Sequence, residues 1–168
     1  FYERAGYVDT LSGKQGSVTL IGAVSPQGGD FSEPVTQNTR RFVRCFWALD
    51  KSLAYARHYA AINWNQSTSE YIDELSHWYA ENINRSFLTL RAELQEILHE
   101  EDSLLEVVKL IGSDVLPEDQ KLLLEIARVV RVGYLQQNAF HPDDMSVPME
   151  KQFKMMKVID YLYRACKA

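Results

Sequence analysis

The pattern of apolar and polar positions divides the chain into two unlike parts. In the first part, the apolar run over 18–24 (VTLIGAV) is short and bounded by turn residues, which favours a buried strand of a parallel sheet. From residue 67 onward, apolar side chains recur at helical spacing, as at Ile83, Phe87, Leu90, Leu94, Ile97 and Leu98. The pattern therefore predicts a piece of α/β structure followed by a bundle of helices.

The elements of the first part are short. Residues 1–6 (FYERAG) indicate the last turns of a helix that stops at the glycine. Residues 34–42 favour a short helix, with Thr36 or Asn38 as its capping residue. Between the run 18–24 and this helix lies a loop with two adjacent glycines, in which the chain can turn sharply.

Residues 44–50 (RCFWALD) are ambiguous. Their aromatic side chains favour a strand, but a helical stripe also fits, through Phe42, Phe46, Leu49 and Leu53. We favour a strand that ends near Asp50, followed by a short helix through His58 and a loop over 59–66. Both interpretations stay open at this level.

The second part predicts four helices. The first begins at the Ser67-Thr-Ser69 run, with acidic residues near its start, and extends to about His99, where the acidic run 100–103 breaks it. A short helix over 104–111 ends at Gly112. The last two begin at prolines, which are tolerated in the first turn. One starts at Pro117 and carries Leu123, Ile126, Val130 and Tyr134 on one face. The other starts at Pro148, after a loop over 138–147.

Composition narrows the function classes only slightly. A hydrophobic content of 46% is that of an ordinary globular domain, and the net charge of −5 argues against a nucleic-acid partner, because such binding depends on clustered Lys and Arg. No apolar run has the length of a membrane span, so we expect no direct membrane insertion. Cys45 and Cys166 lie far apart without metal-ligand spacing, which is typical of buried thiols in a reducing cytosol.

The sequence contains no phosphate-binding loop motif. The pattern GxxxxGK[ST] is absent, because Gln15 follows Gly13-Lys14 and the first glycine is missing. His58, His77, His99 and His141 are scattered, and we expect neither a metal site nor catalytic residues. The pair Asp143-Asp144 and the run 100–102 are typical of solvated charges. From composition alone, the aromatics Tyr59 and Phe140 are more often core or interface residues than ligands.

Several blocks, taken together, resemble the catalytic A subunit of V-type and A-type rotary ATPases. Their residues are FYERAG (1–6), GSVTLIGAVSPQGGDFSEPVTQNTRRFV (16–43), FWALD (46–50), RHYAAINW (57–64), YLQQNAF (134–140) and EKQF (150–153). Separated blocks in the family's order are more specific than one short motif. Residues 65–133 resemble the family mainly in helical character.

The resemblance implies a mainly α fold. Residues 1–66 are expected to be the C-terminal part of a RecA-like α/β nucleotide-binding domain, and residues 67–168 an all-α helical bundle, the C-terminal helical domain. The chain is then a fragment of the subunit. The phosphate loop, the catalytic Glu and the Asp associated with magnesium would lie upstream, and the arginine finger would come from a neighbouring B subunit.

The resemblance also implies two sites. In the first, Tyr59 would stack on adenine, and the segment that closes around the base comprises Gln137, Asn138, Ala139 and Phe140. In the second, a loop would face the central shaft subunit with Gly28, Gly29, Asp30, Phe31, Ser32 and Glu33. The ligand of the full subunit would be ATP or ADP with Mg²⁺, and the fragment alone is expected to bind ATP weakly and to show no ATPase activity.

The partners implied are B subunits, which alternate with A subunits in an A3B3 ring, and the shaft. The complex would couple ATP hydrolysis or synthesis to proton or sodium translocation, with this subunit cytoplasmic and peripheral on the membrane. The chain departs from the family at Tyr59-Ala60, where Phe-Pro is common, and at Gln27, which replaces a second proline. The helical domain of the family also continues past Ala168.

Two other interpretations remain. One is a stand-alone helical interaction module with the same fold and no enzymatic activity, which predicts a gene that begins near Phe1. The other is a relative such as the noncatalytic B subunit or a secretion ATPase. The GGDFSEP run at 28–34 favours the catalytic A subunit over both of these relatives.

Overall fold

The computed structural model describes residues 1–167, which form two compact units. Unit 1 comprises residues 1–46 with 68–70, and unit 2 comprises residues 47–67 with those from Tyr71 onward. Each unit is described separately. Among residues 1–167, no helix combines the length and the apolar character that crossing a membrane requires.

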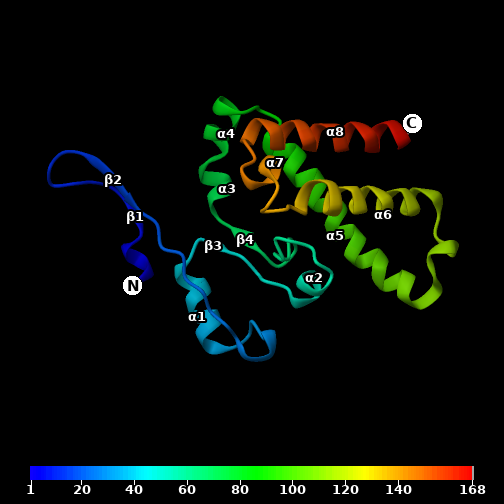
Figure 1. The fold of residues 1–168 in the computed structure, drawn as a ribbon, viewed down its shortest axis with the longest axis horizontal. Coiled ribbons are helices and arrows are strands. Elements are labelled where there is room, and N and C mark those ends of the chain that lie inside the picture. The colour runs from blue at the N-terminus through cyan, green and yellow to red at the C-terminus, as the bar shows by residue number, and fades with distance from the viewer. Residues whose placement is uncertain (168) are drawn as a thin grey trace. The chain divides into compact units, whose positions relative to one another are not determined.

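Unit 1 contains short elements. They are the 3-10 helix η1 (Tyr2–Arg4), the strands β1 (Gly6–Asp9) and β2 (Gln15–Val18), the 3-10 helix η2 (Gln27–Gly29), the helix α1 (Pro34–Phe42), and the strands β3 (Cys45–Phe46) and β4 (Thr68–Ser69). The first two strands pair antiparallel as a hairpin, drawn blue in Figure 1, and β3 pairs antiparallel with β4.

The strand expected over 18–24 is wrong. β2 ends at Val18, residues 19–24 have no regular structure, and the side chain of Ile21 is 85% exposed. A buried parallel strand needs neighbours that satisfy its backbone groups. Val18 pairs with Gly6 at the end of β2, but no strand among residues 1–167 includes residues 19–24, so the apolar character of that stretch does not produce a strand here.

The helix expected over 34–42 is confirmed as α1, but its cap is a different residue. The carboxylate of Glu33 accepts hydrogen bonds from the Thr36 N–H at 3.2 Å and from the Thr36 hydroxyl at 3.1 Å. Pro34 occupies the first turn, where its missing N–H costs nothing. The cap therefore precedes the helix, and neither Thr36 nor Asn38 is the capping residue.

Unit 2 contains the helices that position the candidate site. They are α2 (Lys51–Tyr55), α3 (Tyr71–Glu74), α4 (Ser76–Asn82), α5 (Phe87–Ile111), the 3-10 helix η3 (Ser113–Val115), α6 (Glu118–Val130), the π-helix η4 (Arg131–Leu135), α7 (Pro142–Met145) and α8 (Met149–Lys167). Helices α5, α6 and α8 pack pairwise against one another (Figure 1). Their shared core contains Phe87, Leu90, Leu94, Ile97, Leu98, Leu123, Ile126, Ala127, Val130, Met156 and Ile159.

Two boundaries differ from those expected in the helical part. The single helix expected from Ser67 to about His99 is wrong, because Thr68–Ser69 form the strand β4 and the rest of the region belongs to α3, α4 and α5. The break between α4 and α5 has a local cause: the Asn84 side chain accepts the Ser86 N–H at 3.0 Å and so offers the backbone an alternative to helix. The break expected at 100–103 is wrong, since α5 continues to Ile111. Glu101 lies in that helix with a buried side chain, paired with Arg131 at 2.8 Å.

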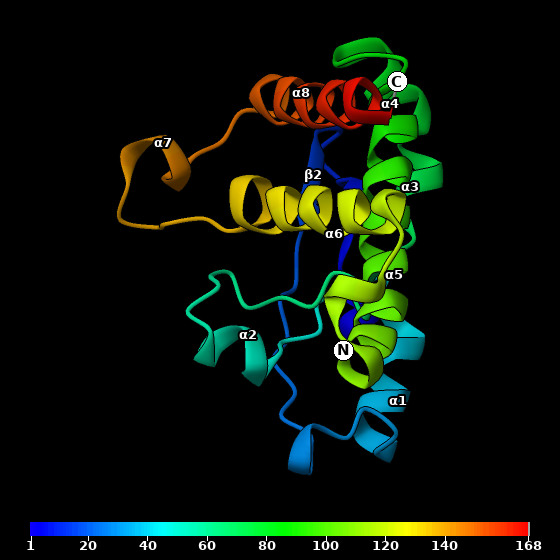
Figure 2. The same cartoon turned by 90° about the vertical axis from the view of Figure 1, so that its right-hand side faces the viewer.

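The burial expected for the thiols of Cys45 and Cys166 is wrong, since both residues are exposed. Other signals are confirmed. Gly112 ends α5 with a φ of 84°, Pro117 is the N-cap of α6, and α8 begins directly after Pro148. The expected face of α6 is buried at Leu123, Ile126 and Val130. The loop expected over 138–147 contains the short helix α7, and Figure 2 shows how it carries the chain outward between α6 and α8.

Candidate functional site

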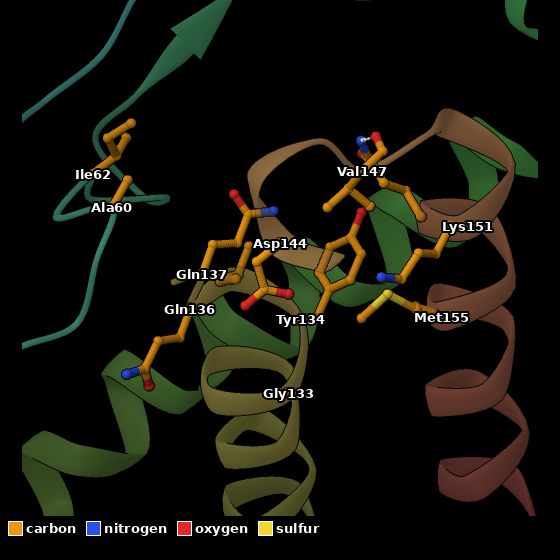
Figure 3. Close-up of a pocket in the computed structure, with 12 residues that line it drawn as sticks. Ala60, Ile62, Gly133, Tyr134, Gln136, Gln137, Asp144, Val147, Lys151 and Met155 are labelled. Carbon is orange, nitrogen blue, oxygen red and sulfur yellow. Dashed lines mark hydrogen bonds between the residues drawn. The ribbon is translucent and has the colours of Figure 1, made fainter. Parts of the chain in front are cut away.

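A hollow in unit 2 adjoins the segment after α2. Its cavity volume is about 320 Å³, within the size range of small-molecule sites. The lining includes Ala60, Tyr134, Gln137, Asp144, Lys151 and Met155, drawn as sticks in Figure 3. These residues come from the loop after α2, the π-helix η4, the loop after η4 that carries α7, and helix α8.

Backbone hydrogen bonds connect the segment around Tyr59 to the end of η4. The Gln137 N–H donates to the Tyr59 carbonyl at 2.6 Å, and the imidazole Nε2 of His58 donates to the Arg131 carbonyl at 3.0 Å. His58 is buried and its ring packs against Trp64 with centroids 5.6 Å apart. The segment is therefore fixed through its backbone and His58, while the Tyr59 side chain remains 57% exposed.

Hydrogen bonds also order the segment that carries Phe140. The Asn138 N–H donates to the Asp144 carboxylate at 3.0 Å, the Phe140 N–H donates to the Asn138 side-chain oxygen at 3.0 Å, and the His141 N–H donates to the Asn138 carbonyl at 2.9 Å. The Phe140 side chain is 98% exposed. The loop thus presents an aromatic ring that the described part of unit 2 does not cover.

The structure brings only some of the expected adenine-site residues together. Gln137 lines the hollow and is bonded to Tyr59. Tyr59 and residues 138–140 do not line it, and residues 137–140 are exposed on the adjoining loop. Their role in adenine binding stays a prediction.

Asp144, Lys151 and Tyr134 were not expected at the site. Asp144 is half-buried and accepts the Asn138 N–H, whereas its neighbour Asp143 is a solvated charge, with a side chain 77% exposed. Burial raises the pKa of the Tyr134 phenol. The sequence signal that could have identified Asp144 is Pro142 followed by two acidic residues, which is typical of the first turn of a helix.

Arg131, whose carbonyl is bonded to His58, also forms a buried ion pair with Glu101. The Arg131 guanidinium is 2.8 Å from the Glu101 carboxylate, whose side chain is 3% exposed. Burial raises the pKa of Glu101, and the positive charge of Arg131 opposes part of this shift. The Asn65 amide, on the segment after Tyr59, also hydrogen-bonds to the Asp102 carboxylate. These contacts tie the segment after α2 to α5 and η4.

The candidate shaft-facing loop lies in unit 1 and is locally ordered. Gly28 and Gly29 have φ values of 65° and 76°, which favour glycine. The Asp30 carboxylate accepts hydrogen bonds from the Ser32 N–H at 2.9 Å and the Ser32 hydroxyl at 2.6 Å, and these bonds lower the pKa of Asp30. The Phe31 ring packs edge-on against Phe46, with centroids 5.5 Å apart.

Not all six residues of this loop are available to a partner. The Glu33 carboxylate caps α1, and Phe31 is half-buried, so both are engaged within unit 1. Asp30 and Ser32 remain exposed. Within residues 1–167, no group of three or more His, Cys, Asp or Glu side chains could hold a metal ion.

Comparison with known proteins identifies the family of both parts of the chain. Residues 1–69 match the family model described as ATP synthase alpha/beta family, nucleotide-binding domain, and residues 76–168 match the C-terminal domain of V and A type ATP synthase. A solved structure of the ATP synthase subunit NeqB from Nanoarcheaum equitans superposes with a TM-score of 0.74. It covers 88% of this chain and 36% of that one at 19% identity, so it supports the fold alone.

Relatives with established names are more similar. The V-type ATP synthase alpha chain of Halothermothrix orenii is 60% identical over 99% of this chain, and the A subunit of the A-type ATP synthase of Methanosarcina mazei is 56% identical over 95% of it. The chain spans 28% of the length of each of these relatives. It belongs to the family of V-type and A-type ATP synthase alpha chains, also named A subunits.

Proposed function

We propose that this chain forms the adenine-binding side and the shaft-facing loop of the catalytic subunit of a V/A-type ATPase. The full subunit would couple ATP hydrolysis or synthesis to the translocation of protons or sodium ions. The observation that carries the proposal is the 2.6 Å hydrogen bond between Gln137 and the Tyr59 carbonyl. It joins two segments that each present an exposed aromatic ring, Tyr59 and Phe140.

Stacking is the main contact that these residues can offer to a nucleotide. Every base has a π-face, and stacking on an aromatic side chain contributes about 1–3 kcal/mol per base. The Gln137 amide can both donate and accept hydrogen bonds, as the edge of adenine also does. Asn138 and Ala139 connect this amide to Phe140 and would close the segment around the base.

The triphosphate and Mg²⁺ would be bound by other parts of the full-length subunit. Residues 1–167 include no cluster that fits a metal ion, and the sequence lacks the phosphate-loop motif. We therefore assign no step of phosphoryl transfer to these residues. The assembled subunit would catalyse the reaction, and this chain alone would not.

The two parts of the chain would have different roles in the complex. Residues 1–66 would complete the nucleotide-binding domain, and residues 67–168 would form the helical domain, which moves as a near-rigid body when the nucleotide changes. The loop 28–33 would face the central shaft, with Asp30 and Ser32 as its exposed polar groups. The partners would be B subunits in an A3B3 ring, on the cytoplasmic side and attached to the membrane through the complex.

The adenine role can be tested in the full-length subunit within its assembled complex. Replacing Tyr59 by Ala should raise the KM for ATP about 5- to 150-fold, because a stacking contact of about 1–3 kcal/mol is lost. Phe140→Ala should raise it in the same direction. Inhibition by inorganic tripolyphosphate, which has no base, should not change.

A matched control is Tyr55→Ala. Tyr55 is 86% exposed and lies at the end of α2, four positions before Tyr59. Unlike Tyr59, whose carbonyl accepts the Gln137 N–H, it lies outside the segment that is bonded to the loop after η4. This variant should keep the wild-type KM. If the Tyr59 and Phe140 variants both keep it as well, the chain does not bind the base through these rings.

A further inference from the structure

We propose that Asp144 is a positioning residue for the aromatic loop of the nucleotide site. Its carboxylate fixes the backbone of Asn138 and thereby holds the Phe140 ring where a base could stack on it. This inference rests on the proposed adenine-binding function. Asp144 itself is not expected to contact the nucleotide.

Asn138 lies at the centre of the contacts that order this loop. Its N–H donates to Asp144, and its side-chain and main-chain oxygens accept the N–H groups of Phe140 and His141. Three hydrogen bonds of 2.9–3.0 Å thus fix the backbone across residues 138–141. Of these three, only the bond to Asp144 reaches outside the segment. At the other end of the segment, the His141 carbonyl accepts the N–H groups of Asp144 and Met145, so the Asp144 carboxylate is what fixes the Asn138 end relative to α7.

Asp144 is itself held in place. Its N–H donates to the His141 carbonyl at 3.1 Å, which closes the turn that begins α7. The Lys151 ammonium group donates to the carbonyl of the preceding residue, Asp143, at 2.9 Å and so anchors α7 to α8. Figure 3 shows Asp144 and Lys151 on the same hollow, with Tyr134 between the loop and α8.

Apolar packing does not hold Phe140 in place. Its ring is 98% exposed, so burial of apolar surface does not order the loop. Without the carboxylate, residues 138–141 would sample more conformations, and a ligand would have to order them on binding. Because α8 belongs to the packed helices α5, α6 and α8, the aromatic loop is also connected to that bundle.

The test compares substitutions at two adjacent carboxylates of α7 in the full-length subunit within its complex. Asp144→Ala should raise the KM for ATP about five- to tenfold and leave kcat within about twofold, since the lost bond orders the binding surface before any chemistry. Asp144→Asn keeps an acceptor oxygen and should stay within about twofold of the wild-type KM. Asp143→Ala is the matched control and should behave as wild type, because the Asp143 carboxylate is exposed and contacts only the exposed His141 imidazole, at 3.9 Å, and not the Asn138 backbone.

A measurement on the wild-type protein covers the case in which Asp144→Ala does not fold. The Asn138 amide should exchange its hydrogen more slowly than the Ala139 amide in the nucleotide-free complex, because Asp144 accepts the Asn138 hydrogen bond. Equal exchange rates would overturn the proposal.

The outcomes distinguish a failure of the positioning role of Asp144 from a failure of the proposed adenine-binding function. If Asp144→Ala keeps the wild-type KM while Tyr59→Ala raises it, Asp144 does not position the loop, but the adenine site stands. If Asp144→Ala and Tyr59→Ala both keep the wild-type KM, the proposed adenine site itself is wrong. If Asp144→Ala lowers kcat as strongly as it raises KM, or if Asp144→Asn shows no rescue, the positioning role is refuted.

Discussion

The two candidate sites of this chain are ordered in opposite ways. In the loop 28–33 of unit 1, the hydrogen bonds of the Asp30 and Glu33 carboxylates join residues only two or three positions apart in sequence. In unit 2, the segment around Tyr59 is held by bonds to residues 73 and 79 positions away. A loop of the first kind tolerates changes elsewhere in the chain. A surface of the second kind exists only while the helical bundle holds both segments.

The largest loss of stability that we expect in the helical bundle is that caused by Arg131→Met. The substitution leaves the buried Glu101 carboxylate without its partner, and breaking such a pair costs about 3 kcal/mol or more. Hydrogen exchange of α5 and α6 amides in the full-length chain should therefore accelerate about a hundredfold. Exchange in the loop 28–33 should not change.

The double variant Arg131→Met with Glu101→Leu is the control for this prediction. It removes both charges and should recover much of the lost protection. If the single variant instead accelerates exchange equally in the loop 28–33, the contrast between a locally ordered loop and a bundle-dependent site is incorrect.

The second prediction concerns Asp50, which also orders the segment before Tyr59. Its carboxylate accepts the Ser52 N–H at 2.7 Å as the cap of α2 and the Asn63 amide at 3.0 Å. Asp50→Ala should cost about 1–2 kcal/mol of stability in this segment, measured as faster exchange of residues 51–65. Asp50→Asn should lose less.

The pH dependence of this cap has a defined sign. The hydrogen bond from Ser52 lowers the pKa of Asp50 below its ordinary value of 3.8, with smaller contributions from Asn63 and the backbone. The ionised carboxylate therefore stabilises the folded state above that value, and the contribution disappears as the pH falls through the lowered pKa. The exchange rates of residues 51–65 in the wild type and in Asp50→Ala should accordingly become more alike in strong acid. A difference in these rates that grows in acid would contradict the role of ionised Asp50 as the cap of α2.

The third prediction tests the local loop. Gly28 has a φ of 65°, a conformation that costs an alanine about 1 kcal/mol. Gly28→Ala should thus accelerate exchange in residues 26–33 alone and leave the KM for ATP unchanged. Gly6→Ala, at a glycine with ordinary φ and open space around its Cα, is the matched control. A change in KM would show that this loop and the nucleotide site are not independent.

The same contrast explains which features could be predicted from the sequence. Helix α1, the stop at Gly112, the start at Pro117 and the apolar face of α6 follow from local signals, and each is confirmed. The acidic run 100–103 has the local pattern of a solvated turn, but Glu101 is buried because Arg131, far along the chain, pairs with it.

Asp144 was missed for a related reason. Nothing in its sequence neighbourhood distinguishes it from Asp143, and only the folded loop brings it to the Asn138 N–H. The prediction for residues 18–24 was wrong in the opposite direction, since their strand pattern is strong but no strand among residues 1–167 includes residues 19–24. Local signals therefore predict several helices and the glycine and proline at which they end or begin, whereas long-range partners decide which charges are buried and which apolar runs form strands.

The smallest effect expected is a slope in stability with pH that arises from Glu101. Burial raises its pKa above the ordinary value of 4.5, so the folded state binds more protons than the unfolded state just above that pH. The contribution of Glu101 to stability therefore decreases as the pH rises through this window. Glu101→Gln cannot titrate, so the wild type should lose exchange protection in α5 relative to this variant as the pH rises above the ordinary value of 4.5. A flat difference would mean that Arg131 offsets the whole cost of burying the charge, and Glu101 would then add no pH dependence to the bundle that holds the site.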